Sequence, residues 1–263
     1  MTKRGNRVRN PHLSKPHLRD AAFDAILFDK DGTLIDFDAT WGPAAFSVME
    51  SLADGDGGAL DRLMQVSEYV LTERRFLPSS PLVAGSSAHY GPLWAQALGR
   101  GCDADFIALM DELFLEAGLA HLAPIGDPQA LCADLAARGH VLGIATNDSQ
   151  ASAQAQAHAL GIADAMRFVA GYDSGHGSKP EPGMITAFVA AHGFAPARVA
   201  LVGDSLHDLH AARAAGVRAI AVLSGPRGEA ARAEVAPFAD HVIASITQLP
   251  FLLDDLAGAG REA

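Results

Sequence analysis

The alternation of short apolar runs with helix-forming segments, which begins at residue 23, most constrains how this chain can fold. The apolar runs have the length of buried strands and lie at residues 25–28, 140–146, 166–171, 199–203, 217–223 and 241–244. Helices are predicted at residues 127–138, 149–160, 182–192, 206–215 and 228–235, and glycine follows several of them. Strands that alternate with helices indicate an α/β fold in which helices cover both faces of a parallel sheet.

Residues 38–122 interrupt this alternation. They contain no convincing strand, and helices are predicted near residues 42–53, 58–76, 87–99 and 104–117. Connectors that contain glycine and proline separate several of these patterns. We therefore expect a Rossmann-like α/β core domain of residues 21–37 and 123–263, with a helical domain of residues 38–122 inserted after the first strand.

The charge of the chain is unevenly distributed. The formal net charge is −11, but residues 1–19 contain six lysines and arginines and no acidic residue, which leaves −17 for the rest of the chain. An acidic body argues against nucleic acid as a partner. Residues 1–20 are expected to form a disordered basic tail.

The apolar residues and the cysteines narrow the class of protein further. Hydrophobic residues make up 49% of the chain, which excludes wholesale disorder. No run of 18 uncharged apolar residues occurs, so neither a transmembrane helix nor a membrane partner is expected. Cys102 and Cys132 are too few for a disulfide framework or a zinc site, and such usage suits the cytoplasm.

Four clusters of polar residues follow predicted strands, at the edge of a parallel sheet where ligands bind. In the first cluster, Asp29 and Asp31 are two positions apart and lie on the same side of an extended chain. Neighbouring carboxylates repel each other and favour a cation such as Mg²⁺, which prefers oxygen ligands. Gly32 permits a tight turn, and the alternative interpretation is an ordinary surface turn.

The second and third clusters contain groups that bind anions. Thr146 and Asn147 offer a hydroxyl and successive backbone N–H groups where a strand gives way to a helix, although Asn147 or its neighbours could instead cap that helix. Lys179 is the only lysine after residue 30, although a single lysine in a Gly/Pro-rich loop is usually a solvated charge.

The fourth cluster has the sequence GDSLHD and follows the strand at residues 199–203. Asp204 and Asp208 are four residues apart, so a helix that begins there would present both on one face. The alternative is that Asp204 caps this helix and that the helix dipole favours Asp208.

Together, the four clusters resemble the motif set of the haloacid dehalogenase superfamily of phosphohydrolases, over residues 23 to about 245. The order DxDGT, Thr146, Lys179 and GDxxxD, each after a strand, is highly specific for the superfamily and only weakly specific for a substrate. The helical insertion is similar to that of the phosphoglycolate phosphatase-like branch, in which a small cap closes over the active site.

The resemblance implies a role for each acidic residue. Asp29 would be the nucleophile that forms an aspartyl-phosphate, and Asp31 would be the general acid and then the general base. Mg²⁺ would be held by the Asp29 carboxylate, the Asp31 backbone carbonyl and Asp204. Asp208 would support the water shell of the metal or orient Lys179.

The same resemblance implies a binding site for the phosphoryl group. Thr146, the amide near Asn147 and Lys179 would bind its oxygens, and Thr33 would support the site from behind. Most of the catalysis would then come from positioning and electrostatics.

Two further observations discriminate within the superfamily. The dehalogenases proper do not keep an aspartate two residues after the nucleophile, so Asp31 favours phosphate chemistry. The phosphonate-cleaving branch uses a cap lysine, and no lysine lies between Lys30 and Lys179. A phosphosugar mutase, and a non-catalytic binding or regulatory protein on the same fold, remain as alternatives.

The sequence points less clearly to the residues that select the substrate. Arg74 or Arg75, late in a predicted helix, could clamp a substrate carboxylate or could simply be solvated. Phe37 and Trp41 could close against the substrate or pack at the base of the cap. The expected function is a Mg²⁺-dependent phosphatase for a small phosphorylated metabolite, with 2-phosphoglycolate as a candidate, acting as a monomer or homodimer.

Overall fold

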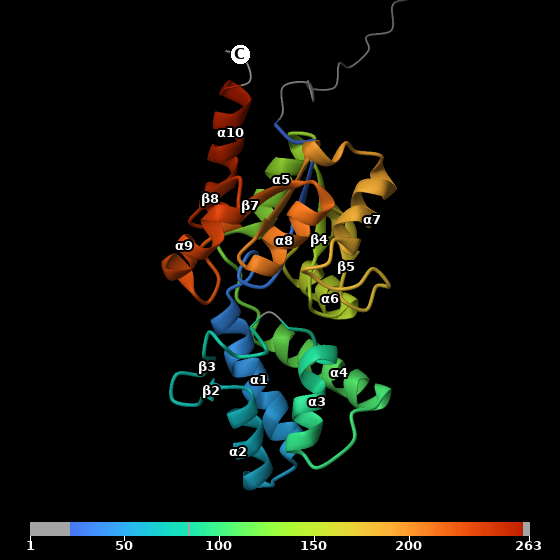
Figure 1. Ribbon diagram of the computed structural model, residues 1–263, viewed down its shortest axis with the longest axis vertical. Helices are drawn as coiled ribbons and strands as arrows, with labels where there is room; N and C mark the ends of the chain where they lie inside the picture. The colour runs from blue at the N-terminus through green and yellow to red at the C-terminus, as the bar shows by residue number, and fades with distance from the viewer. Residues whose placement is uncertain (1–21, 84, 260–263) are drawn as a thin grey trace, which may run out of the picture.

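A six-stranded sheet forms the centre of the computed structural model, which describes residues 22–83 and 85–259 (Figure 1). All of its strand pairs are parallel, and the strand order is β5-β4-β1-β6-β7-β8. The strands are β1 (Ala25–Phe28), β4 (Val141–Ala145), β5 (Met166–Ala170), β6 (Val199–Gly203), β7 (Arg218–Val222) and β8 (His241–Ile243). The predicted α/β fold with a parallel sheet is confirmed.

Strand β1 lies in the middle of the sheet, between β4 and β6. All four of its residues are fully buried, as expected for a strand with apolar side chains on both faces. The next strands along the chain, β4 and β5, lie on one side of β1, and the later strands β6, β7 and β8 lie on the other side, so the direction of strand order reverses at β1. Ligands of open α/β sheets bind beyond the carboxyl ends of the strands at such a reversal.

The two faces of the sheet pack against different helices because side chains alternate along a strand. Ala25 and Leu27 belong to one buried cluster, with residues of helices α7 (Gly183–His192) and α8 (Leu206–Ala215). Ile26 and Phe28 belong to the other cluster, with residues of helices α5 (Pro128–Ala137) and α10 (Leu249–Ala259). The helices of the core are α5 (Pro128–Ala137), α6 (Gln150–Ala159), α7 (Gly183–His192), α8 (Leu206–Ala215), α9 (Arg232–Val235) and α10 (Leu249–Ala259).

The last part of the chain differs from the prediction in two ways. The prediction of a single α-helix over residues 228–235 is wrong, because a 3-10 turn at Gly228–Ala231 precedes the four-residue helix α9. Helix α10 was not predicted. Its second residue is Pro250, a position at which proline removes no intrahelical hydrogen bond.

Between β1 and β4, the chain forms a separate group of helices at one end of the molecule (Figure 1). They are α1 (Phe37–Ala53), α2 (Gly57–Val66), α3 (Ser87–Ala97) and α4 (Ala104–Ala120), with a short hairpin of β2 (Tyr69–Val70) and β3 (Arg75–Phe76). We call residues 37–120 the inserted segment. None of the helices in the described residues is long and apolar enough to cross a membrane.

The hairpin contradicts two expectations, a continuous helix over residues 58–76 and the absence of strands from residues 38–122. Helix α2 ends at Val66, and tertiary partners engage the next residue, Ser67. The Trp94 indole donates to the Ser67 hydroxyl at 2.9 Å, and the Ser80 hydroxyl donates to its carbonyl at 2.6 Å. Glu68 then adopts a φ of 51°, which turns the chain into β2.

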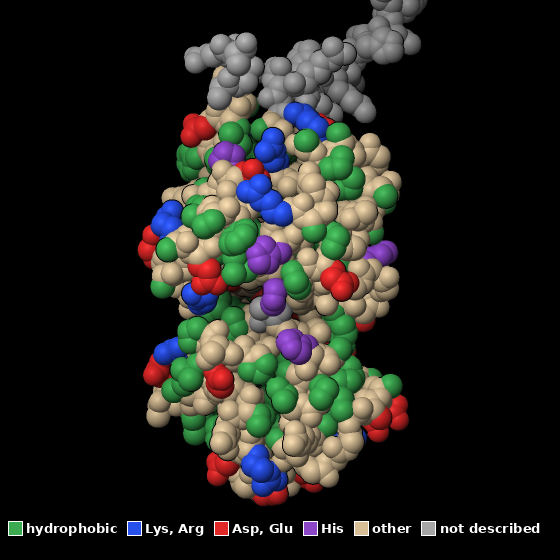
Figure 2. Space-filling model, viewed as in Figure 1, with side chains coloured by type: hydrophobic (Ala, Val, Ile, Leu, Met, Phe, Trp, Pro, Cys, Tyr) green, Lys and Arg blue, Asp and Glu red, His purple; other side chains and the backbone are tan. Residues whose placement is uncertain are grey.

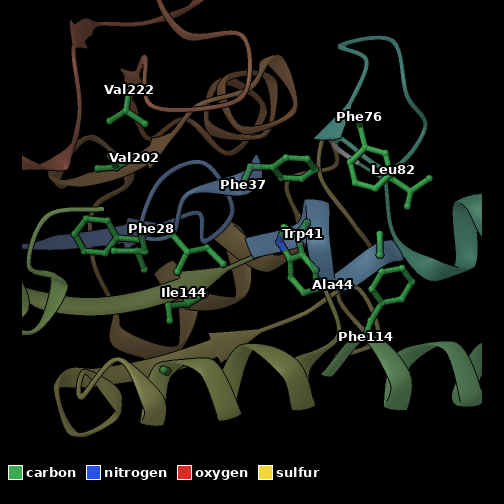
Figure 3. Packing of buried hydrophobic residues seen from close by; sticks show 14 of the residues in the cluster. Phe28, Phe37, Trp41, Ala44, Phe76, Leu82, Phe114, Ile144, Val202 and Val222 are labelled. Atoms are coloured by element: carbon green, nitrogen blue, oxygen red, sulfur yellow. The ribbon is translucent and has the colours of Figure 1, made fainter. Parts of the chain in front are cut away.

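Aromatic side chains fill the interior of the inserted segment and continue towards the sheet (Figure 3). The Trp41 and Phe114 rings meet edge to face with centroids 6.0 Å apart, and Trp94, which is fully buried, lies 5.6 Å from Phe114. A single cluster of buried residues contains these rings and also Phe28 of β1. The inserted segment and the sheet therefore share a continuous apolar core.

Candidate active site

The loop after β1 is a tight turn that presses against two neighbouring loops. The backbone N–H groups of residues 33, 34 and 35 all donate to the carbonyl of Lys30. Gly32 has a φ of 79°, and a Cβ atom there would lie 2.7 Å from a carboxylate oxygen of Asp204 and 2.9 Å from the Cα of Gly225. Only glycine therefore fits at position 32.

Asp29 is buried at the carboxyl end of β1 and is paired with a lysine from a distant loop. The Lys179 ammonium donates to Asp29 Oδ1 at 2.5 Å and to Asp208 Oδ1 at 2.6 Å. Burial alone would lower the pKa of Lys179, but the Asp208 and Asp29 carboxylates raise it above the usual lysine range. Lys179 is therefore a fixed positive charge between two carboxylates, and not the solvated loop lysine of the alternative interpretation.

Asn147 joins the second and third clusters. Its side-chain amide donates to the Lys179 carbonyl at 2.9 Å, and its side-chain oxygen accepts from the Lys179 backbone N–H at 2.8 Å. The cap of the following helix α6 is instead Ser149, which accepts from the Ser152 N–H. The role of Asn147 in the fold is thus to hold the backbone of Lys179 at the end of β4.

Asp31 does not share Lys179 with Asp29 but accepts hydrogen bonds from a different set of side chains. Its Oδ1 accepts from the Lys30 ammonium at 2.7 Å and from the Trp41 indole at 2.5 Å, and its Oδ2 accepts from the Thr146 hydroxyl at 3.4 Å. Lys30 also lies 3.0 Å from the Asp148 carboxylate. Burial lowers the pKa of Lys30, but Asp31 and Asp148 raise it by more, so the net shift is upward.

The sequence analysis did not assign a function to Lys30 or Asp148. A signal was available, because a lysine that directly follows an apolar strand and lies between two aspartates needs buried partners. Asp148, however, is 118 positions away from Lys30, so only the fold identifies it as that partner.

The start of α8 separates the roles of Asp204 and Asp208. Ser205, and not Asp204, is the N-cap residue of this helix, and its backbone N–H and hydroxyl both donate to Asp208 Oδ2. Asp208 is therefore held by Ser205 and Lys179. Asp204 is left facing Gly32 and Gly225, across the loop that carries Asp29 and Asp31.

The acidic residues are compatible with a divalent cation. Carboxylate oxygens of Asp29, Asp204 and Asp208 all lie within 4.8 Å of one another. Burial raises the pKa of Asp29 to about 7, opposed by Lys179 and reinforced by Asp208 and Asp31. Burial also raises the pKa of Asp204 well above its usual range, with further contributions from Asp29 and Asp208. A cation with a preference for oxygen ligands would relieve this excess of negative charge.

Thr33 lies behind these acidic residues and is fully buried. Its hydroxyl oxygen has no hydrogen-bond partner among the residues that the structure describes. Thr33 thus lies on the same loop as Asp29 and Asp31, but its hydroxyl makes no hydrogen bond to either carboxylate.

A cavity of about 700 Å³, including the open space at its mouth, connects these residues to the inserted segment. On the core side it is lined by Asp29, Asp31, Thr146, Lys179 and Asp204, among others. On the other side, residues of α1, β3, α3 and α4 complete its wall. Figure 2 shows a hollow between the two parts of the molecule, with hydrophobic and histidine side chains near its margins.

The two arginines considered for substrate binding do not line this cavity. Arg74 is exposed, and its guanidinium lies 5.9 Å from the centre of the Phe46 ring. Arg75 pairs with Glu73 at 2.6 Å. Because the chain forms a hairpin here and not the end of a long helix, both side chains are directed elsewhere.

Comparison with known proteins agrees with this arrangement. Residues 23–216 match the family model described as haloacid dehalogenase-like hydrolase. The chain is 33% identical over 211 residues to a phosphoglycolate phosphatase of Rhodospirillum rubrum, a match that covers 76% of this chain and 80% of that one. It is 30% identical to a phosphoglycolate phosphatase of Mesorhizobium japonicum, over 75% and 81% of the two chains.

A solved structure supports the same fold. The crystal structure of a predicted phosphoglycolate phosphatase from Haemophilus somnus superimposes with a TM-score of 0.67 at 18% sequence identity, and the match covers 90% of this chain and 99% of that one.

Proposed function

The chain belongs to the haloacid dehalogenase-like hydrolases and is a phosphoric monoester hydrolase, and from this premise we propose a Mg²⁺-dependent phosphatase that works through an aspartyl-phosphate. The observation that carries the proposal is the pairing of Asp29 with Lys179, at 2.5 Å, at the bottom of a cavity that Asp31 also lines. A buried carboxylate beside a fixed ammonium can receive a phosphoryl group whose charge the ammonium offsets.

In this mechanism, an Asp29 carboxylate oxygen attacks phosphorus, and the bond from phosphorus to the ester oxygen breaks. Asp31 donates a proton to the departing oxygen and is left as a carboxylate. It then takes a proton from the water that attacks phosphorus in the aspartyl-phosphate, which releases inorganic phosphate and restores Asp29. One residue performs both proton transfers because the first prepares it for the second.

The phosphoryl oxygens would be bound by the Lys179 ammonium, the Thr146 hydroxyl and the backbone amide near Asn147. Asp208 would keep Lys179 in place, which its contact at 2.6 Å supports. The Asp29 and Asp204 carboxylates and the Asp31 carbonyl would hold Mg²⁺. The metal would supply positive charge between the phosphate and Asp29.

We propose that residues 38–122 act as a cap domain on a core domain of residues 21–37 and 123–263. The cavity between the two parts supports this division, since a substrate bound at Asp29 would contact both. The substrate is a small phosphorylated metabolite, and 2-phosphoglycolate is the first ester to test because two relatives carry its name. The free thiols of Cys102 and Cys132 suit our further proposal that the enzyme acts in the cytoplasm.

The test measures phosphate release from a panel of phosphomonoesters with and without Mg²⁺. We expect Mg²⁺-dependent phosphate release that Asp29→Asn abolishes. Asp164→Asn, on the exposed surface of the core domain, should leave this release unchanged. Asp31→Asn should give a stoichiometric burst of the alcohol from a chromogenic aryl phosphate, followed by slow turnover. Substantial steady turnover by Asp29→Asn would exclude the aspartyl-phosphate.

A further inference from the structure

The wall of the cavity opposite Asp29 and Asp31 is built from apolar side chains of the inserted segment. They are all buried and come from four elements and the connector before α3, namely Phe37, Trp41, Phe76, Leu82, Tyr90 and Phe114. Figure 3 shows five of them close together, with Trp41 between Phe37 and Phe114. Ring contacts hold the wall in shape, with the Phe37 and Phe76 centroids 6.1 Å apart and Tyr90 and Phe114 6.0 Å apart.

The polar atoms of this wall already have partners within the protein. The Trp41 indole donates to Asp31, and the Tyr90 hydroxyl lies 3.3 Å from the Ser87 hydroxyl. Burial also raises the pKa of Tyr90, so its hydroxyl is neutral. What the wall offers a bound molecule is therefore mainly apolar surface.

The charges around the cavity oppose a second anionic group on the substrate. Of the described residues that line it, four are aspartates, namely Asp29, Asp31, Asp148 and Asp204. The only lysine or arginine among them is Lys179, and its ammonium is already bound by Asp29 and Asp208. Lys30 pairs with Asp31 and Asp148 but does not line the cavity, so a carboxylate beyond the phosphate would meet no lysine or arginine in the described lining that lacks a carboxylate partner.

Other cations in the neighbourhood are engaged elsewhere. Arg227 lines an adjoining cavity that shares Asp204 and His207 with the first, and its guanidinium pairs with Glu234 at 2.5 Å. Arg75 pairs with Glu73 outside the cavity. His207 is the only imidazole in the described lining of the active-site cavity, so it is the one remaining side chain there that could carry a positive charge to a carboxylate.

From these observations we propose that the substrate carries an apolar group, aromatic or branched, on the alcohol side of its phosphate ester and no second anionic group. This inference rests on the proposed phosphatase function and names the class of ester that the same site takes. The phosphate would lie against Lys179 and Asp29, and the apolar group would lie against Trp41, Phe76 and Phe114. The affinity for that group would come from burial of its surface.

The test compares two esters that differ only in the group on one methylene. Benzyl phosphate carries a phenyl ring where 2-phosphoglycolate carries a carboxylate. With the full chain and Mg²⁺, we expect kcat/KM for benzyl phosphate to exceed that for 2-phosphoglycolate by roughly tenfold or more, the usual scale for an apolar group in an apolar pocket. A higher kcat/KM for 2-phosphoglycolate than for benzyl phosphate would overturn the inference. If His207→Ala then abolished that preference for 2-phosphoglycolate, His207 would be the residue that binds its carboxylate.

A charge placed in the wall provides an independent check. Val83 lines the cavity and is only partly buried, so a longer side chain can be accommodated. Val83→Lys should shift the ratio of the two kcat/KM values towards 2-phosphoglycolate. Val83→Met, which has a similar apolar stem and no charge, should leave the preference for benzyl phosphate. Equal ratios in the two variants would contradict the inference.

Binding separates failure of this inference from failure of the proposed function. Asp29→Asn should bind both esters without turning them over, and calorimetry should give the lower Kd for benzyl phosphate. If wild-type protein hydrolyses no ester but the variant still prefers benzyl phosphate, the inference stands and the proposed chemistry fails. If 2-phosphoglycolate binds more tightly, the inference fails whether or not hydrolysis occurs.

Discussion

Lys30 shows at the scale of a single residue how the site is held together. Its ammonium is almost completely buried, between the carboxylates of Asp31 and Asp148 and 4.9 Å from the centre of the Trp41 ring. A buried ammonium is tolerated only when charges and hydrogen bonds compensate for lost water, and this one has two carboxylates and a ring face. Asp31 is thereby fixed in position before a substrate arrives.

Replacing Lys30 should impair the step that needs a positioned proton donor. In Lys30→Met, Asp31 loses an anchor and Asp148 loses its ion pair with Lys30, so the free energy of unfolding should fall by about 3–5 kcal/mol. The fall in kcat should be larger for an alkyl phosphate than for 4-nitrophenyl phosphate, whose leaving group needs little protonation. Steady-state kinetics with both esters, together with urea unfolding, measure the two effects.

The comparison between esters distinguishes positioning from simple loss of structure. A variant that is merely less folded would lose the same fraction of activity with both esters. Trp41→Phe, which removes the indole donor to Asp31 but keeps a ring, should show the same selectivity with a smaller loss. Equal losses for the two esters in both variants would argue against a role for these contacts in proton transfer.

At the scale of elements, the loops after β1, β6 and β7 are in close contact through glycines. A Cβ atom on Gly225, just after β7, would lie 1.8 Å from Asp204 Oδ2. The φ of Gly225 is outside the left-handed region, so alanine is not excluded by that angle, and the nearest obstacle is the Asp204 side chain. The loop after β7 thus limits where the Asp204 carboxylate can lie.

Gly225→Ala should therefore weaken metal binding without unfolding the protein. Displacement of the Asp204 carboxylate should raise the Mg²⁺ concentration for half-maximal activity by roughly tenfold or more, the scale seen when groups that support metal ligands are changed. Mg²⁺ titrations of phosphatase activity measure this shift. Gly57→Ala is the matched control, because a Cβ there meets no atom within 4 Å.

An unchanged Mg²⁺ requirement in Gly225→Ala, with the fold intact by circular dichroism, would mean that Asp204 does not hold the metal. If Gly57→Ala raised the Mg²⁺ concentration for half-maximal activity as much as Gly225→Ala, the effect would not be specific to the loop after β7.

At the scale of the whole molecule, a hydrogen bond near the end of β5 connects the inserted segment to the core, in addition to the bond from Trp41 to Asp31. The Tyr172 hydroxyl, just after β5, donates to Asp111 Oδ2 of α4 at 2.7 Å. Burial raises the pKa of both groups. The contact fixes α4, which carries Phe114, relative to the strand ends that carry the acidic residues.

Tyr172→Phe should loosen this connection. We expect the free energy of unfolding to fall by about 1 kcal/mol, the typical contribution of one hydrogen bond, and KM to rise because the apolar wall is less well placed. Tyr69→Phe is the control, since its hydroxyl donates to the Gly42 carbonyl within the inserted segment. It should lower stability to a similar degree and leave KM unchanged. A rise in KM in both variants would refute a specific role for the Tyr172 contact.

The amino-acid sequence alone was sufficient for the features that depend on local pattern and chain order. The strands that precede Asp29, Thr146 and Asp204 follow from short apolar runs, and parallel pairing brings their carboxyl ends to one edge of the sheet. Gly32 could likewise be assigned to a tight turn. These properties are local because periodicity, turn chemistry and burial of a central strand need no knowledge of distant partners.

The tertiary structure alone decided which distant residues meet. Helix α2 ends just before Ser67, whose hydroxyl accepts from the Trp94 indole 27 positions away, and the hairpin that follows leaves Arg74 and Arg75 outside the cavity. The pairing of Lys30 with Asp148 and the apolar wall depend in the same way on contacts between segments far apart in the chain. The motifs therefore support the proposed chemistry at the phosphate, whereas the apolar wall proposed to meet the rest of the substrate arises only from packing.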